Sequence, residues 1–263
     1  MFEYGPIDNS NKPPFINKDA LKGKKLKMTA AEMFHFVRLF GVLIGDLVSH
    51  TNPFWKLYCL LREILEIVMA RKLPKTMVGN LRVLIAEHHR LYMELTGNSF
   101  KPKFHFVTHA PEVFLQSGPL NNISSIRFEA KHRDLTSPAS VNTSRINICR
   151  SVAIKHQLAL CYRFIENKSI LPPMNIGSRT RDLSPEFGQI THIFVSHDIL
   201  GDVPIFLCKR YLTLGLDSHV LAYEVELIDE KICVIATNLV DPLPVYAHTM
   251  SNGAKYIVLR YCI

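Results

Sequence analysis

The hydrophobic spacing of this chain changes once, and that change limits the folds that it can adopt. From Thr29 to about residue 166 the apolar residues recur every three or four positions, the period of a helix with one buried face. After Pro172 the pattern becomes short runs of β-branched and aromatic residues separated by Gly, Asp, Asn and Pro, which is typical of strands and turns. We therefore predict an α+β protein, mainly α-helical in its N-terminal two-thirds and followed by a small β-rich C-terminal module.

Three amphipathic helices are predicted in the first hundred residues. Thr29 and Glu32 form a capping box, in which each side chain satisfies a backbone N–H group at the helix end. The first helix is therefore expected to run from Thr29 to about Val48. Similar apolar spacing predicts helices over residues 53–71 and 76–96. We interpret this part of the chain as a helical bundle.

The rest of the chain is predicted to hold one more long helix and several strands. A short apolar stretch, Phe104–Leu115, precedes a Ser-Gly-Pro turn, and a helix is expected from Thr143 or Ser144 to about Glu166. Strands are expected at Ile190–Ser196, Ile205–Leu212, Val220–Ile228, Ile232–Thr237 and Tyr256–Tyr261. A small barrel is the fold that we expect for this β-rich part.

These patterns divide the chain into four units. Residues 1–28, rich in proline and lysine, are predicted to be a tail or linker, and residues 29–170 a helical domain. Residues 171–189 are predicted to be a second linker, and residues 190–263 a small β-rich domain.

The composition argues against several classes of protein. The sequence has no run of about 18 uncharged apolar residues, so we expect no membrane span. Its N-terminus has the pattern of neither a secretory signal nor a transit peptide. The six cysteines are scattered and form no CxxC pair, which argues against a disulfide framework and a ribbon-type zinc site. We therefore expect an intracellular protein.

The positive charge of the chain is concentrated in two segments. The formal net charge of +8 favours an anionic partner. Residues 18–27 hold five lysines and one aspartate, and residues 127–163 hold seven Lys or Arg residues and two acidic ones. Such a segment either contacts nucleic-acid phosphates or forms a solvated helix face, and charge alone does not separate these two interpretations.

Several sequence blocks occur in a specific order before residue 166. They are Lys-Pro-Lys-Phe-His-Phe-Val-Thr-His at 101–109, Gly-Pro at 118–119, Arg-Phe-Glu-Ala-Lys-His at 127–132 and Lys-His-Gln-Leu at 155–158. In these blocks the chain resembles the animal branch of the EnSpm/CACTA transposases. The resemblance covers most of residues 4–166, and it identifies the chain as the C-terminal portion of such a protein.

This resemblance implies an RNase H-like fold and a site in which three acidic residues hold two divalent metal ions, with Mg²⁺ as the metal of the full-length family. Glu129 matches the third acid, and the helices before it match an insertion ahead of that acid. The other two acids belong to family segments that lie before Tyr4, so we expect neither a cofactor nor a complete enzyme for this chain. Alternatively, Glu129 is an ordinary helix carboxylate paired with Arg133, four residues later.

Basic residues around and after Glu129 are the candidates for DNA binding. Lysine and arginine contact phosphate oxygens without reading the base sequence. With the resemblance, the DNA-binding residues are expected to be Arg127, Lys131, Arg133, Arg145, Arg150 and Lys155. We accordingly expect a nuclear location.

His105 and His109 are weak candidates for a metal site. Their spacing of four residues puts two imidazoles on one helix face, where both could bind zinc. Two further ligands are not evident in the sequence. A packed, hydrogen-bonded pair is therefore the preferred interpretation.

Three functions remain open from the sequence. The first is a truncated or domesticated transposon-derived protein that retains binding to DNA or protein but not catalysis. The second is a non-catalytic interaction module whose β-rich part contacts a protein partner. The third is that the sequence is an incomplete gene model of a full-length, metal-dependent DDE transposase.

Overall fold

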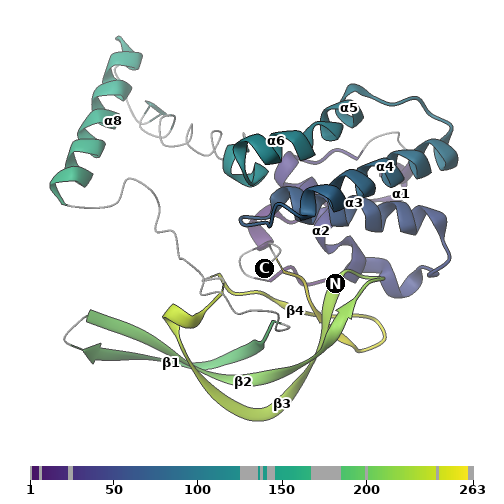
Figure 1. The fold of residues 1–263 in the computed structure, drawn as a ribbon. Helices are drawn as coiled ribbons and strands as arrows, with labels where there is room; N and C mark the ends of the chain where they lie inside the picture. Colours follow the sequence, from purple (N-terminus) through teal and green to yellow (C-terminus); the bar gives the residue numbers. More distant parts are fainter. Residues whose placement is uncertain are drawn as a thin grey trace.

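The computed structural model confirms the predicted α+β class (Figure 1). It describes residues 2–5, 8–22, 26–124, 136, 139–140, 146–166, 185–198, 201–240 and 243–259. Helices occupy the N-terminal two-thirds, and an antiparallel sheet follows in the C-terminal third.

The four predicted helices are present among the α-helices of the structure. The α-helices are α1 (Lys18–Lys22), α2 (Ala30–Ile44), α3 (Pro53–Met69), α4 (Met77–Thr96), α5 (Pro102–Thr108), α6 (Ala110–Ser117) and α8 (Ile148–Ile165). The predicted ones are α2, α3, α4 and α8, although α8 begins at Ile148 rather than at Thr143 or Ser144. Helix α1, which lies in the predicted tail, and helices α5 and α6 were not among the predicted helices. Short 3₁₀ segments lie at η1 (Asp8–Asn11), η2 (Gly45–Leu47), η3 (Leu120–Ile123) and η4 (Ala236–Asn238). The capping box of α2 forms as predicted, since Glu32 N donates to Thr29 Oγ1 over 3.3 Å and Thr29 N donates to Glu32 Oε2 over 2.7 Å.

Helices α3 and α4 pack through the apolar stripes that predicted them. Ile64 and Ile67 of α3 form a buried cluster with Leu81 and Ile85 of α4. Ala110, at the start of α6, packs against the same cluster. Local signals fix the ends of these helices: the Asn52 side chain accepts hydrogen bonds at the start of α3, and Gly97, with φ 62°, ends α4.

The described strands form an open antiparallel sheet rather than the expected small barrel. They are β1 (Phe187–Asp198), β2 (Gly201–Asp217), β3 (Ala222–Ile235), β4 (Ala247–Thr249) and β5 (Lys255–Ile257). The order is β1-β2-β3-β5-β4, so β1 and β4 lie at its two edges within the described part of the chain. Strand β4 was not predicted, and residues 260–261 of the last expected strand lie outside the described residues.

The predicted break between two strands at residues 229–231 is wrong, because β3 continues through it. Asp229 and Glu230 remain in the strand, where they face basic residues of β2. Lys209 Nζ lies 2.9 Å from Asp229 Oδ1, and Arg210 Nη1 lies 3.1 Å from Glu230 Oε2. The pairing register shifts between Lys209 and Tyr211, which accommodates the extra residues of β3.

Helix α2 shares a hydrophobic core with the sheet. Leu39 and Val42 pack in one buried cluster with Val220, Ala222 and other residues of the sheet region. Burial raises the pKa of another member of this cluster, Tyr256, to about 12. The helical part and the β-rich part therefore share a buried apolar core.

The turn between β2 and β3 adds polar contacts to this interface. Trp55 Nε1 donates to the His219 carbonyl oxygen over 3.0 Å. His219 Nε2 lies 2.9 Å from Gly45 O and 3.0 Å from Val48 O, and since both oxygens are acceptors, Nε2 carries the proton. One imidazole thus links the end of α2 to the sheet.

The start of the chain also contacts the sheet. The ring of Phe2 stacks on His248 of β4 with centroids 4.8 Å apart. Tyr246 donates a hydrogen bond to the Glu3 carboxylate, and His248 Nδ1 lies 3.1 Å from the Glu3 carbonyl oxygen. Residues 2–5, which were predicted to belong to a tail, are thus held against β4.

Gly41 provides a test of the packing between α2 and the sheet. A Cβ at this position would lie 2.0 Å from Val220 O, which is backbone. We expect Gly41→Ala to lower the free energy of unfolding by about 1–3 kcal/mol, because α2 must move away from the turn. Urea unfolding followed by circular dichroism measures this change.

Gly79→Ala is the matched control, because a Cβ there meets open space on α4. This variant is expected to gain up to about 1 kcal/mol, since alanine favours the helix. If Gly41→Ala were as stable as the original chain, α2 would not pack on Val220 in solution.

Candidate nucleic-acid interface

Most residues of the predicted DNA-binding site lie outside the described residues. These are Arg127, Lys131, Arg133 and Arg145, together with the matched acid Glu129. Arg150 and Lys155 are described, and both lie on α8.

Helix α8 is exposed over most of its length and stands apart from the other helices (Figure 1). It begins after Asn147, whose side chain accepts a hydrogen bond from Arg150 N over 3.3 Å. Its large apolar residues include Leu158, which is 62% exposed, and Ile165, which is 80% exposed. Its 18 residues contain no Asp or Glu, so the helix carries positive charge without internal neutralisation.

Arg150 and Lys155 do not form one basic stripe along α8. Both side chains are exposed. They are five residues apart, which corresponds to about 140° around the helix axis. A straight phosphate backbone lying along α8 would therefore contact one of them at a time.

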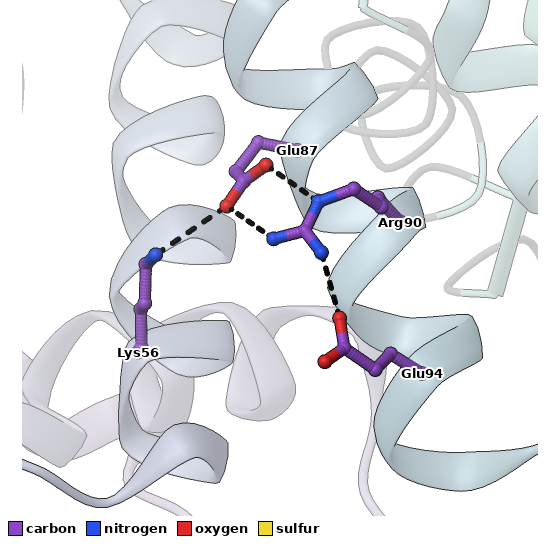
Figure 2. A network of polar contacts seen from close by, with 4 residues as sticks. All are labelled: Lys56, Glu87, Arg90 and Glu94. Atoms are coloured by element: carbon purple, nitrogen blue, oxygen red, sulfur yellow. Dashed lines mark hydrogen bonds and ion pairs between the residues drawn. The ribbon is translucent and has the colours of Figure 1, made fainter.

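By contrast, the basic residues of the α3–α4 face are neutralised by acids (Figure 2). Glu87 accepts from Arg90 through both carboxylate oxygens, at 2.9 and 3.0 Å, and from Lys56 Nζ at 3.3 Å. A second acid, Glu94, accepts from Arg90 Nη1 at 2.7 Å. These hydrogen bonds lower the pKa of Glu87 to about 2. This face has its cations paired and offers little to a phosphate.

The two predicted metal candidates are close together. His105 Nε2 and His109 Nε2 are 3.1 Å apart, with the two rings nearly perpendicular. The predicted hydrogen bond is present, but both side chains are exposed, so the pair is not packed in a core. Among the described residues, no group of three or more His, Cys, Asp or Glu is placed to hold a metal ion.

Asp46, at the end of α2, has a structural role. Its Oδ2 accepts hydrogen bonds from the backbone N of Ser251, over 3.1 Å, and from the Ser251 hydroxyl. It therefore fixes the turn between β4 and β5 to the helical part of the chain.

The sequence reasoning missed an exposed group of aromatic and basic residues on and beside α5. Lys101, Lys103 and Phe106 are exposed there, and Phe106 keeps 67% of its surface in contact with solvent. The signal in the sequence is the alternation of basic and aromatic residues in Lys-Pro-Lys-Phe-His-Phe, which was used for the resemblance but not as a surface feature.

No described helix combines the length and apolar character needed to cross a bilayer. In comparisons with known proteins, no family model, curated protein or solved structure matches this chain. The resemblance to transposases therefore stays a prediction from the sequence blocks.

The ion-pair network in Figure 2 can be tested by titration of Glu87. We expect carbon-detected NMR to give a Glu87 pKa of about 2 and a value nearer the ordinary 4.3 or so in the double variant Lys56→Met and Arg90→Met. Because the folded pKa is the lower one, the stabilisation is complete above the ordinary pKa and is lost as the pH falls toward 2.

Lys75→Met is the control for this titration, since Lys75 is exposed and lies outside the network. It should leave the pKa of Glu87 unchanged. An ordinary Glu87 pKa in the original chain would show that the network does not form in solution.

Proposed function

We propose that this chain is a transposon-derived, nuclear protein that binds DNA non-specifically through phosphate contacts and does not by itself catalyse transposition. The observation that carries the proposal is α8, an exposed helix with basic residues and no acid among its 18 residues. The basic residues before it, from Arg127 to Arg145, extend the positive segment in the sequence. The transposase-like blocks make DNA the expected polyanion.

Phosphate contacts of this kind predict a strong dependence on salt. Each neutralised phosphate releases condensed counterions, so the logarithm of the binding constant falls with the logarithm of salt concentration. If all six candidate residues contact phosphates, the slope is about −5 on duplex DNA. The angular separation of Arg150 and Lys155 favours a smaller value, because a single backbone does not reach both.

We propose no reaction for this chain on its own. A two-metal mechanism needs several carboxylates to hold both Mg²⁺ ions, and Glu129 matches one of three. The family resemblance implies Mg²⁺ for a full-length transposase, but binding to phosphates through Lys and Arg requires no metal. DNA binding is therefore expected to persist in the presence of a chelator.

A protein-interaction module is the second candidate function, and the exposed surface of β1 favours it. Ile193, Phe194 and Val195 are 62%, 53% and 50% exposed on an edge strand. Exposed apolar residues at a sheet edge are typical of protein contacts. In this alternative the basic segment serves solubility.

The test is fluorescence anisotropy with a labelled non-specific duplex over a salt series. The variant replaces Lys131, Arg133, Arg145 and Arg150 with Ala. We expect the original chain to bind with an affinity that falls steeply with salt, and the variant to bind at least tenfold more weakly because phosphate contacts are lost.

The matched control replaces Lys12, Lys72, Lys75 and Lys231 with Ala, which removes the same charge from exposed positions elsewhere. It should bind nearly as well as the original chain. An equal loss in both variants would mean that net charge, not this segment, attracts the DNA. Failure of the original chain to bind at low salt would favour the protein-interaction module.

A further inference from the structure

The aromatic residues of α5 point to opposite sides of the helix. Phe104 and Phe106 are two residues apart, which is about 200° around a helix axis. The ring of Phe104 lies 4.6 Å from Tyr92, 5.3 Å from Phe100 and 5.4 Å from His89. Phe106 instead faces solvent and is 67% exposed. The contacts of the Phe104 ring hold α5 against α4, and Phe106 lies on the other, solvent-facing side of α5.

Two imidazoles extend the exposed aromatic surface beside Phe106. The His105 ring centroid lies 6.4 Å from that of Phe106 and 4.7 Å from that of His109. Both histidine side chains are exposed. We call Lys101, Lys103, His105, Phe106 and His109 the α5 ring surface.

The charge of the α5 ring surface is positive. Lys101 and Lys103 are exposed, and neither has an ion pair with another described residue. Residues 97–111 contain no Asp or Glu. The next acid along the chain, Glu112, lies 3.6 Å from Arg82. The segment that carries the exposed rings therefore also carries two exposed lysines and no carboxylate of its own.

Exposed rings and exposed lysines in one short segment fit a polyanion whose bases are open to stacking. In single-stranded DNA the base faces are free to stack on aromatic side chains, while lysines contact the phosphates. A duplex hides its base faces, so it would engage the lysines alone. RNA presents the same base faces and phosphates and differs by its 2′-hydroxyl, so the choice of DNA over RNA rests on the proposed function.

We propose that the α5 ring surface is a binding site for single-stranded DNA, in which a base stacks on Phe106 and the flanking phosphates contact Lys101 and Lys103. His105 and His109 border the stacked base. The site is separate from the basic segment that includes α8. It prefers single-stranded to duplex DNA and does not distinguish base sequences.

The experiment compares the binding of labelled oligo(dT) of about 12 nucleotides with that of an abasic oligomer of the same length, by fluorescence anisotropy. We expect Phe106→Ala to weaken binding to oligo(dT) by about 5- to 100-fold, because base stacking is lost, and to leave the abasic oligomer unaffected. Phe106→Tyr should retain oligo(dT) binding. Lys103→Ala should weaken binding to both probes, since both carry phosphates.

Phe54→Ala is the matched control, because Phe54 is an exposed phenylalanine of α3 with 59% of its surface in solvent. It should bind both probes like the original chain. Thermal melting by circular dichroism checks that each variant is folded, which we expect because both phenylalanines are exposed.

Three results would overturn the proposal. They are unchanged oligo(dT) binding by Phe106→Ala, an equal loss on the abasic oligomer, and tighter binding of oligo(rU) than of oligo(dT). The duplex measurement on the basic segment is independent: if duplex binding is absent while Phe106 controls oligo(dT) binding, this site stands without the proposed function.

Discussion

The contact between α2 and the turn from β2 to β3 is the interaction on which the rest of the structure depends. Two glycines allow it, since a Cβ on Gly41 or Gly45 would lie within 3 Å of Val220. Tyr58 of α3 is hydrogen-bonded to the backbone of α2 close to this contact. Its hydroxyl donates to Val37 O over 3.0 Å and accepts from Gly41 N over 2.8 Å. His219 then joins the end of α2 to the sheet. Helices and sheet are thereby fixed together around one small region.

Local signals in the sequence predicted the long helices but not every strand, nor the packing between the elements. The capping box at Thr29 and the helix end at Gly97 act within a few residues, so both are visible in the sequence. The continuity of β3 was hidden because Asp229 and Glu230 are compensated by side chains some 20 residues away. The three-residue β4 has too few positions to show a period, and its place beside β5 is a tertiary effect.

The candidate site, too, could be predicted only in part from the sequence. The sequence identifies which residues are basic, and the angular separation of Arg150 and Lys155 follows from helix geometry once α8 is known. Exposure is different, because it depends on neighbours from other elements. Phe104 and Phe106 have the same chemistry and nearly the same sequence context, yet the rings of α4 cover one and leave the other in solvent. Only the packed structure separates the partly buried Phe104 ring from the exposed Phe106 ring.

The contact of residues 2–4 with β4 has a consequence for how the chain folds. Residues 2 and 3 are held by residues 246 and 248, and the hydrogen-bonded pairs are 243 and 245 positions apart in the sequence. Bringing such distant segments together costs loop-closure entropy, and contacts of this range are typical of slow folding. Helices α3 and α4 follow each other in the sequence and can pair early in folding, whereas Phe2 stays exposed until β4 reaches it. The contact between residues 2–4 and β4 is therefore expected to form late in folding.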